Sequence, residues 1–158
     1  MLDRNIEVKS IGVVVVTFNS GQYLVDCLRS LKDSLEGIDI DLQIAVVDNH
    51  PKLLDKDLIP ENVHYIQNPS NTGFGSGCNL GFYFLEENFD PDFFMLINPD
   101  AYVAKDFFYQ LDEFLNLNSN LQVPISPLIS FPEKVYSGIA KDLLVIKSKS
   151  VKIKDDLH

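Results

Sequence analysis

The run "IGVVVV" at residues 11–16 constrains the fold of this chain more than any other feature. Its β-branched residues favour a β-strand, and the absence of polar side chains leaves no face of that strand for water. A second run, "IAVV" at residues 44–47, has the same character. Strands that are buried on both faces are typical of parallel sheets with helices on either side. The sequence therefore predicts an α/β protein.

The rest of the chain alternates between strand and helix patterns. Strands are predicted at residues 11–19, 42–49, 62–68 and 92–100. Apolar residues recur at helical spacing from Leu24 to Leu35, from about Ser76 to Asn88, and from about Lys105 to Leu117. This order predicts a mostly parallel sheet flanked by helices, in a single domain over residues 1–158. Within the divergent tail, residues 119–158, we expect an irregular segment at 123–134 and a half-exposed strand at 145–154.

Composition narrows the partners and the location. The net charge of −10 argues against nucleic acid as a partner. No apolar run approaches the length of a membrane span and the first residues lack an apolar signal core, so a cytoplasmic location is expected. Cys27 and Cys78 fall in predicted helices and are interpreted as two buried thiols, not a disulfide. Five lysines, from Lys141 to Lys154, predict a solvated strand or tail, with a contact to the inner face of the membrane or to a partner as the alternative.

The stretch "NPSNTGFGSGCNLG" holds four of the eight glycines of the chain. A dinucleotide fingerprint would need glycine or alanine where Cys78 stands, and a phosphate-binding P-loop would need a Lys-Ser/Thr pair after the glycines. Neither motif is present. Gly77 and Gly81, four residues apart on a predicted helix, are explained by close packing against a neighbour. Gly73 and Gly75 are better explained by a bound ligand or a tight turn.

Three predicted strands end in polar residues, Thr17-Phe18-Asn19, Asp48-Asn49 and Asn98-Pro99-Asp100. In open parallel sheets, ligands bind outside the carboxyl ends of the strands. A single ending of this kind is explained by a helix cap or an Asx-turn. Three on one sheet, beside a glycine-rich loop, predict a binding site.

Four segments in register, "VVVVTFNSGQYLVDCLRSL", "IAVVDN", "NPSNTGFGSGCNLGF" and "FFMLINPDAYV", resemble glycosyltransferase family 2, specifically its rhamnosyltransferase-like branch. The resemblance covers about residues 11 to 118. It implies the GT-A-type nucleotide-diphospho-sugar transferase fold, here truncated. It also implies inverting transfer of a sugar, rhamnose being one candidate, from a UDP- or dTDP-sugar to a polysaccharide, glycan or lipid-linked acceptor.

The resemblance also assigns roles to residues. Thr17, Phe18 and Asn19 would line the nucleotide site and Asp48 would hold the base or ribose. The glycine stretch would border the donor pocket. The full nucleotide-sugar set is Thr17, Phe18, Asn19, Asp48, Asn49, Asn71, Gly73, Gly75 and Asn79.

Asn98-Pro99-Asp100 stands where the family places an Asp-x-Asp metal motif, so the resemblance implies a metal site there. Asp100, with the amide of Asn98 in place of the first acid, would bind Mg²⁺ or Mn²⁺ against the diphosphate. Such hard cations are often held by one or two carboxylates together with substrate phosphates. The cation would neutralise the leaving nucleoside diphosphate.

The catalytic residue is not identified in this sequence. The resemblance places a carboxylate base well downstream of the metal motif, and nothing after Asp100 resembles that segment; the pair Asp155-Asp156 stays unassigned. The leading hypothesis is a glycosyltransferase or its donor-binding portion, and the alternative is a non-catalytic nucleotide-sugar-binding module. A sugar-phosphate nucleotidyltransferase is disfavoured, because the segment "TFNSGQYL" contains neither Arg nor Lys.

Overall fold

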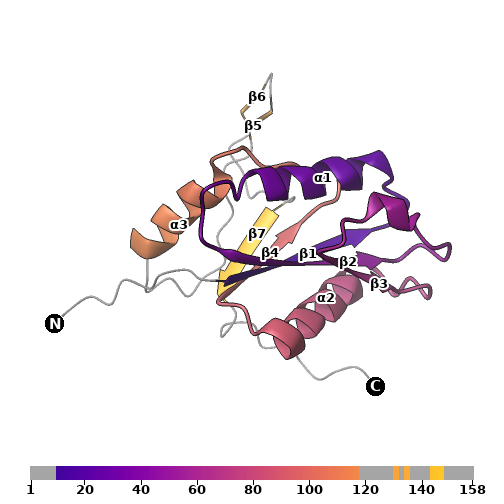
Figure 1. Cartoon of the computed structure of the whole chain (residues 1–158). Coiled ribbons are helices and arrows are strands. Elements are labelled where there is room, and N and C mark those ends of the chain that lie inside the picture. The colour runs from indigo at the N-terminus through magenta and orange to yellow at the C-terminus, as the bar shows by residue number, and fades with distance from the viewer. Residues whose placement is uncertain (1–9, 118–129, 132–133, 136–142, 148–158) are drawn as a thin grey trace.

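A five-stranded sheet in the order β3-β2-β1-β4-β7 forms the centre of the protein (Figure 1). The computed structural model describes residues 10–117, 130–131, 134–135 and 143–147. The strands are β1 (Ser10–Thr17), β2 (Asp41–Asp48), β3 (Val63–Gln67), β4 (Phe93–Ile97) and β7 (Leu143–Lys147). β1 runs parallel to β2 and β4, β2 runs parallel to β3, and β7 pairs antiparallel with β4. The predicted mostly parallel sheet is confirmed.

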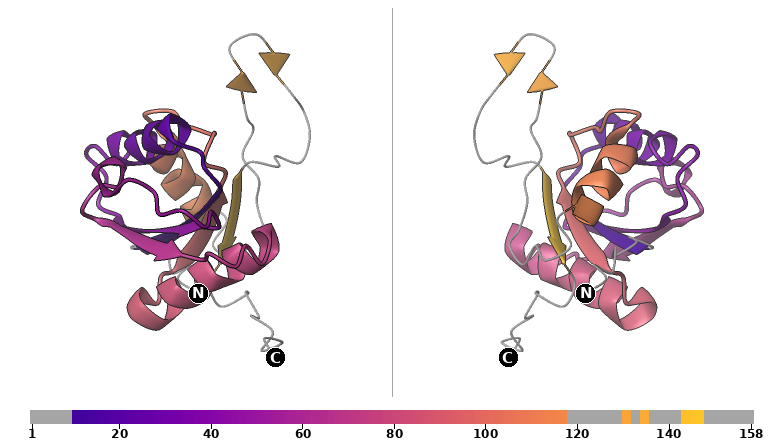
Figure 2. Two further views of the ribbon diagram at one scale, coloured as in Figure 1. Left: turned by 90° about the vertical axis from the view of Figure 1, so that its right-hand side faces the viewer. Right: turned by 90° about the vertical axis from the view of Figure 1, so that its left-hand side faces the viewer.

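Helices cover both faces of this sheet. α1 (Gln22–Asp33) and α3 (Phe107–Leu117) lie on one face and α2 (Phe74–Phe89) lies on the other (Figures 1 and 2). A short 3-10 helix, η1 (Lys56–Leu58), precedes β3. All three predicted helices are present, although α2 begins two residues earlier than expected and α3 two residues later. No helix in the part of the chain that the structure describes is long and apolar enough to cross a membrane.

Residues of β1 alternate between two hydrophobic cores. Val13 and Val15 pack in the core under α1 and α3, whereas Val14 and Val16 pack in the core under α2. Each fully buried side chain of this size contributes about 1.5–3 kcal/mol through removal of apolar surface from water. The expectation that this strand is buried on both faces is confirmed.

α2 approaches the sheet through two of its glycines. A Cβ placed on Gly77 would lie 2.9 Å from Cγ1 of Val16, and one on Gly81 would lie 2.6 Å from Cγ1 of Val14. Real Cβ atoms do not come so close, so any side chain at these positions would displace the helix or the strand. The close packing predicted for this pair is confirmed.

Several predictions for the tail fall only partly on the described residues. The segment expected to be irregular contains a short antiparallel ladder of β5 (Ser130–Phe131) and β6 (Lys134–Val135), so that expectation is wrong for these residues. Of the half-exposed strand expected at 145–154, residues 145–147 lie in β7, which pairs with β4, and residues 148–154 lie outside the described residues. Most of the lysine-rich stretch, the pair Asp155-Asp156 and both ends of the predicted single domain lie outside the described residues.

Candidate functional site

The carboxyl ends of β1 and β2 bring Thr17 and Asp48 side by side. The two residues are partners in the parallel ladder, and the N–H of Asn49 donates to the Thr17 carbonyl at 2.9 Å. Thr17 is 1% exposed and Asp48 is fully buried. Because side chains alternate along a strand, both belong to the face that α1 and α3 cover. Two of the predicted site residues therefore meet at one edge of the sheet.

Asp48 is held by groups of the protein. One carboxylate oxygen accepts the His50 N–H at 3.0 Å and the other accepts the Tyr65 hydroxyl at 2.7 Å. The Leu54 N–H in turn donates to the Tyr65 oxygen at 3.2 Å. Burial raises the pKa of Tyr65; the Leu54 N–H opposes this shift and Asp48 adds to it. Tyr65 therefore stays protonated at neutral pH and can donate to Asp48.

The Thr17 hydroxyl is buried and has no hydrogen-bond partner among the described residues. Leaving a buried polar group unsatisfied costs about 1–3 kcal/mol. Such a group in a native structure calls for an explanation, for example a bound water or a functional contact. Thr17 is the register partner of Asp48, so an unsatisfied hydroxyl and a buried carboxylate stand on neighbouring strands at this edge.

Phe18 and Asn19 continue from this edge into solvent. The Phe18 side chain is 55% exposed, and its ring contacts that of His50 edge to face, with centroids 5.0 Å apart. Asn19 is exposed and adopts a left-handed backbone with φ of 57°. The edge thus presents an open aromatic face next to the buried pair Thr17 and Asp48.

A hydrogen-bonded chain joins β2 to the loop that precedes α2. The buried Asn49 amide donates to the Gly73 carbonyl at 3.3 Å and accepts from Asn68 at 2.8 Å. Asn68 also donates to the Thr72 hydroxyl at 3.1 Å, and Thr72 donates to Ser76 at 2.8 Å. Asn49 therefore has both amide atoms engaged by the protein and fixes the position of the loop.

The first turn of α2 is open toward solvent. Gly73 precedes the helix with φ of 94° and ψ of 170°, a region that side-chain-bearing residues rarely adopt, and no side chain caps the helix. Gly75 lies in the first turn, and a Cβ placed there would meet nothing within 4 Å. Asn71 and Asn79, before and after this turn, are exposed. Uncapped N–H groups and the helix dipole at such a terminus attract anions.

The polar sequence after β4 forms a turn with Asp100 exposed at its tip. The Asn98 carbonyl accepts the Ala101 N–H at 3.1 Å and the Cys27 thiol at 3.6 Å. Burial, and then the charge of Asp100, raise the pKa of Cys27 to about 12, so its thiol stays protonated. Cys27 and Cys78 are both free and buried, as predicted.

Acidic, histidine and cysteine side chains form no group of three or more that could hold a metal ion within the described ranges. Asp100 is a single exposed carboxylate, with the side-chain amide of Asn98 two residues before it. This donor set does not build a closed cage of protein ligands. It fits a hard cation that takes most of its oxygens from water and from a phosphate ligand.

Residues 12–135 match the family model of Glycosyl transferase family 2. The chain belongs to this family. No curated protein matches it.

Solved structures of S. aureus TarS share the fold of this chain. The structure of TarS 1-349 in complex with UDP-GlcNAc has a TM-score of 0.64 at 16% identity, over 88% of this chain and 45% of that one. The complex with UDP has the same TM-score at 14% identity, over 88% and 47%. TarS 1-349 without a named ligand gives 0.56 at 19% identity, over 70% and 33%. The family 2 chain described here thus has the GT-A-type α/β fold, and it spans less than half of these structures.

The sequence of this family 2 domain predicted the polar residues at the strand ends. It did not predict the residues that hydrogen-bond to them. Tyr65 and His50 hold Asp48, and Asn68 with Thr72 holds the glycine loop through Asn49. The polar connector between β3 and the glycines was the available signal for Asn68 and Thr72. Nothing local in the sequence pairs Tyr65 with Asp48, because they lie 17 positions apart on neighbouring strands.

Proposed function

We propose that this chain is the donor-binding part of a glycosyltransferase that transfers a sugar, with inversion, from a nucleoside diphosphate to an acceptor hydroxyl. The observation that carries the proposal is the buried Asp48 beside the Thr17 hydroxyl, which has no partner in the described part of the chain, at the carboxyl edge of a family 2 sheet. Two structures of the similar TarS fold are complexes with UDP-GlcNAc and UDP, which supports a nucleotide-sugar donor.

In this proposal the nucleoside lies over the ends of β1 and β2. The exposed ring of Phe18 offers a stacking surface for the base, with Asn19 beside it. An ionised carboxylate has about four acceptor positions, of which the protein uses two on Asp48, so Asp48 retains capacity for the base or ribose. Asp48 is fully buried, so the nucleoside can reach it only if neighbouring side chains move. We propose that the rings of Phe18 and His50, which contact each other, separate to admit it.

The diphosphate is assigned to the open first turn of α2 and to Asp100. Gly73 and Gly75 allow close approach to uncapped N–H groups, with Asn71 and Asn79 on either side. Asp100, with Asn98, would hold Mg²⁺ or Mn²⁺, which supplies positive charge for the leaving nucleoside diphosphate. A chain of net charge −10 repels an uncompensated diphosphate, which favours a cation at this place.

The finer assignments rest on the sequence resemblance. We propose a rhamnosyltransferase-like enzyme with a UDP- or dTDP-sugar donor and a polysaccharide, glycan or lipid-linked acceptor. We further propose that it works in the cytoplasm at the inner face of the membrane. The lysines between Lys141 and Lys154 would supply the contact to anionic lipid.

Calorimetry with UDP and dTDP, with and without Mn²⁺, tests the site. We expect tighter binding with Mn²⁺. The exposed Asp100, changed to Asn, should lose the metal effect and keep the melting temperature, whereas Asp48→Ala should weaken binding even without metal. Asp33→Asn, an exposed carboxylate at the end of α1, is the matched control. Binding that ignores both metal and Asp48→Ala would contradict the site.

A second candidate function is a nucleotide-sugar-binding module without catalysis. It accounts for the same buried pair, Thr17 and Asp48, because donor binding by itself needs no general base. Release of nucleoside diphosphate, measured with and without candidate acceptors, separates the two functions. We expect slow donor hydrolysis and poor transfer, because a general base contributes about 10²–10⁴-fold. Rapid acceptor-dependent turnover would instead locate a base within this chain, with Asp155 and Asp156 as the first residues to change.

A further inference from the structure

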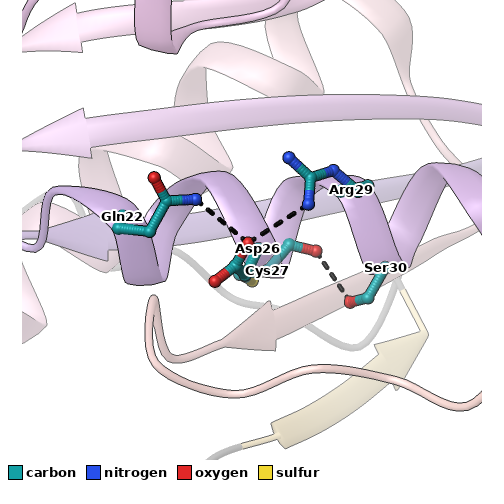
Figure 3. A network of polar contacts seen from close by, with 5 residues as sticks. All are labelled: Gln22, Asp26, Cys27, Arg29 and Ser30. Carbon is teal, nitrogen blue, oxygen red and sulfur yellow. Dashed lines mark hydrogen bonds and ion pairs between the residues drawn. The ribbon is translucent and has the colours of Figure 1, made fainter.

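Hydrogen bonds join α1 to the loop that contains Asp100. The hydrogen bonds of Cys27 and Ser30 place both side chains toward this loop, and Arg29 and Ser30 point to different sides of the helix (Figure 3). The Cys27 thiol donates to the carbonyl of Asn98 at 3.6 Å. The Val103 N–H donates to the Ser30 hydroxyl at 3.1 Å. These bonds join positions 71 and 73 residues apart in the sequence.

The two bonds hold the two ends of one short segment, residues 98–103. Asp100 is exposed between these ends, in a stretch that has no helix or strand. A turn within the segment is closed by the Ala101 N–H on the Asn98 carbonyl, at 3.1 Å. Val103 and Ala101 pack against the core under α1. The backbone on both sides of Asp100 is thus tied to one helix.

Ser30 is itself fixed by its own helix. Its hydroxyl donates to the carbonyl of Cys27 at 2.8 Å, drawn in Figure 3, and so its oxygen lone pairs are directed to the Val103 N–H. One hydroxyl thereby links α1 to the loop as donor and acceptor together. Alanine at this position would remove both bonds, whereas threonine would keep the hydroxyl in a rotamer that helices allow.

We propose that Ser30 and Cys27 are positioning residues for the metal-binding carboxylate of Asp100. The role rests on the proposed function, in which Asp100 holds the divalent cation against the diphosphate. Asp100 belongs to no group of three or more acidic, histidine or cysteine side chains that could hold a metal ion among the described residues. A carboxylate in such a place binds a cation well only if its backbone keeps it in position. Groups that orient a ligand from outside the coordination sphere typically change metal affinity by about 10–100-fold when they are removed.

The test measures the gain in UDP affinity that Mn²⁺ produces in the full chain. Ser30→Ala should reduce this gain roughly 10-fold, the lower end of such effects, and leave metal-free UDP affinity unchanged. Ser30→Thr should restore it. Cys27→Ala removes the bond to the Asn98 carbonyl, and it should also reduce the gain. In the Asp100→Asn background, Ser30→Ala should have no further effect.

Ser34→Ala is the matched control. The Ser34 hydroxyl donates to the carbonyl of Leu31 at 2.9 Å, three residues earlier on α1, as Ser30 does to Cys27. This variant should lower the melting temperature and keep the full metal gain.

The outcomes separate this proposal from the one it rests on. A metal gain in the unchanged chain that survives both Ser30→Ala and Cys27→Ala would overturn the positioning role and leave the proposed function standing. A chain that binds UDP with no metal gain at all would overturn the assignment of Asp100, and the positioning role with it.

Discussion

The glycine stretch contains two pairs of glycines, Gly73 with Gly75 and Gly77 with Gly81, which differ in their surroundings. Within α2, Gly77 and Gly81 face the sheet, and valines of the sheet occupy the space that a side chain at either position would need. At the start of α2, a Cβ placed on Gly73 or Gly75 would meet nothing within 4 Å. The backbone conformation at position 73 requires glycine. At position 75, neither the packing nor the backbone conformation requires it. The same residue type therefore marks a packed interface at one end and an open approach at the other.

The largest effect is expected at the packed end. Gly81→Val adds a branched side chain where Val14 already lies 2.6 Å and Val47 3.2 Å from a Cβ. We expect the free energy of unfolding to fall by about 3 kcal/mol, the upper end for an overpacked core. Denaturant unfolding measures it. Gly75→Val, the same change in open space, is the control, and equal losses in both would contradict the comparison.

A smaller loss is expected for Gly73→Ala. With φ of 94° and ψ of 170°, an alanine at this position is strained by about 1–2 kcal/mol, although space is available for its methyl group. Thermal unfolding should show the loss, while Gly75→Ala, two residues on with an ordinary backbone, should cause none. If Gly73→Ala has the stability of the unchanged chain, the loop can adopt another conformation without loss of stability, which would contradict the prediction.

The smallest change in stability is expected for Gly75→Val, within about 0.5 kcal/mol of zero, because valine is no worse than glycine in a helix. Its effect should appear in ligand binding. If the diphosphate approaches the first turn of α2, affinity for UDP with Mn²⁺ should fall from Gly75 to Ala to Val as the side chain grows. Calorimetry and melting temperature are measured on the same samples. A melting temperature that collapses together with binding would make Gly75 structural.

Much of the site followed from local patterns. The runs of β-branched residues predicted strands buried on both faces, and the polar residues at their ends predicted the edge at which Thr17 and Asp48 meet. The spacing of Gly77 and Gly81 predicted close packing. These features depend on side-chain chemistry and on the periods of strands and helices, which neighbouring residues determine.

Other features could not be predicted, and the start of α2 is one of them. The spacing of the apolar residues predicts a helix from about Ser76, yet α2 begins at Phe74, although glycines weaken helices. Bonds that hold the preceding loop, from Asn49 and Asn68, compensate for that weakness. Contacts with β2 overrule intrinsic propensity here.

The sequence predicts the alternation of elements, the burial of both faces of β1 and the residue types at the strand ends, since all of these depend on side chains near one another in the chain. It does not predict which groups hold those residues, because these contacts form only when the helices and the sheet pack together. Tyr65 reaches Asp48 from the next strand, and Ser30 reaches Val103 from a helix 73 residues away. The direction of a hydrogen bond depends on the placement of both partners, and packing of the helices on the sheet sets that placement.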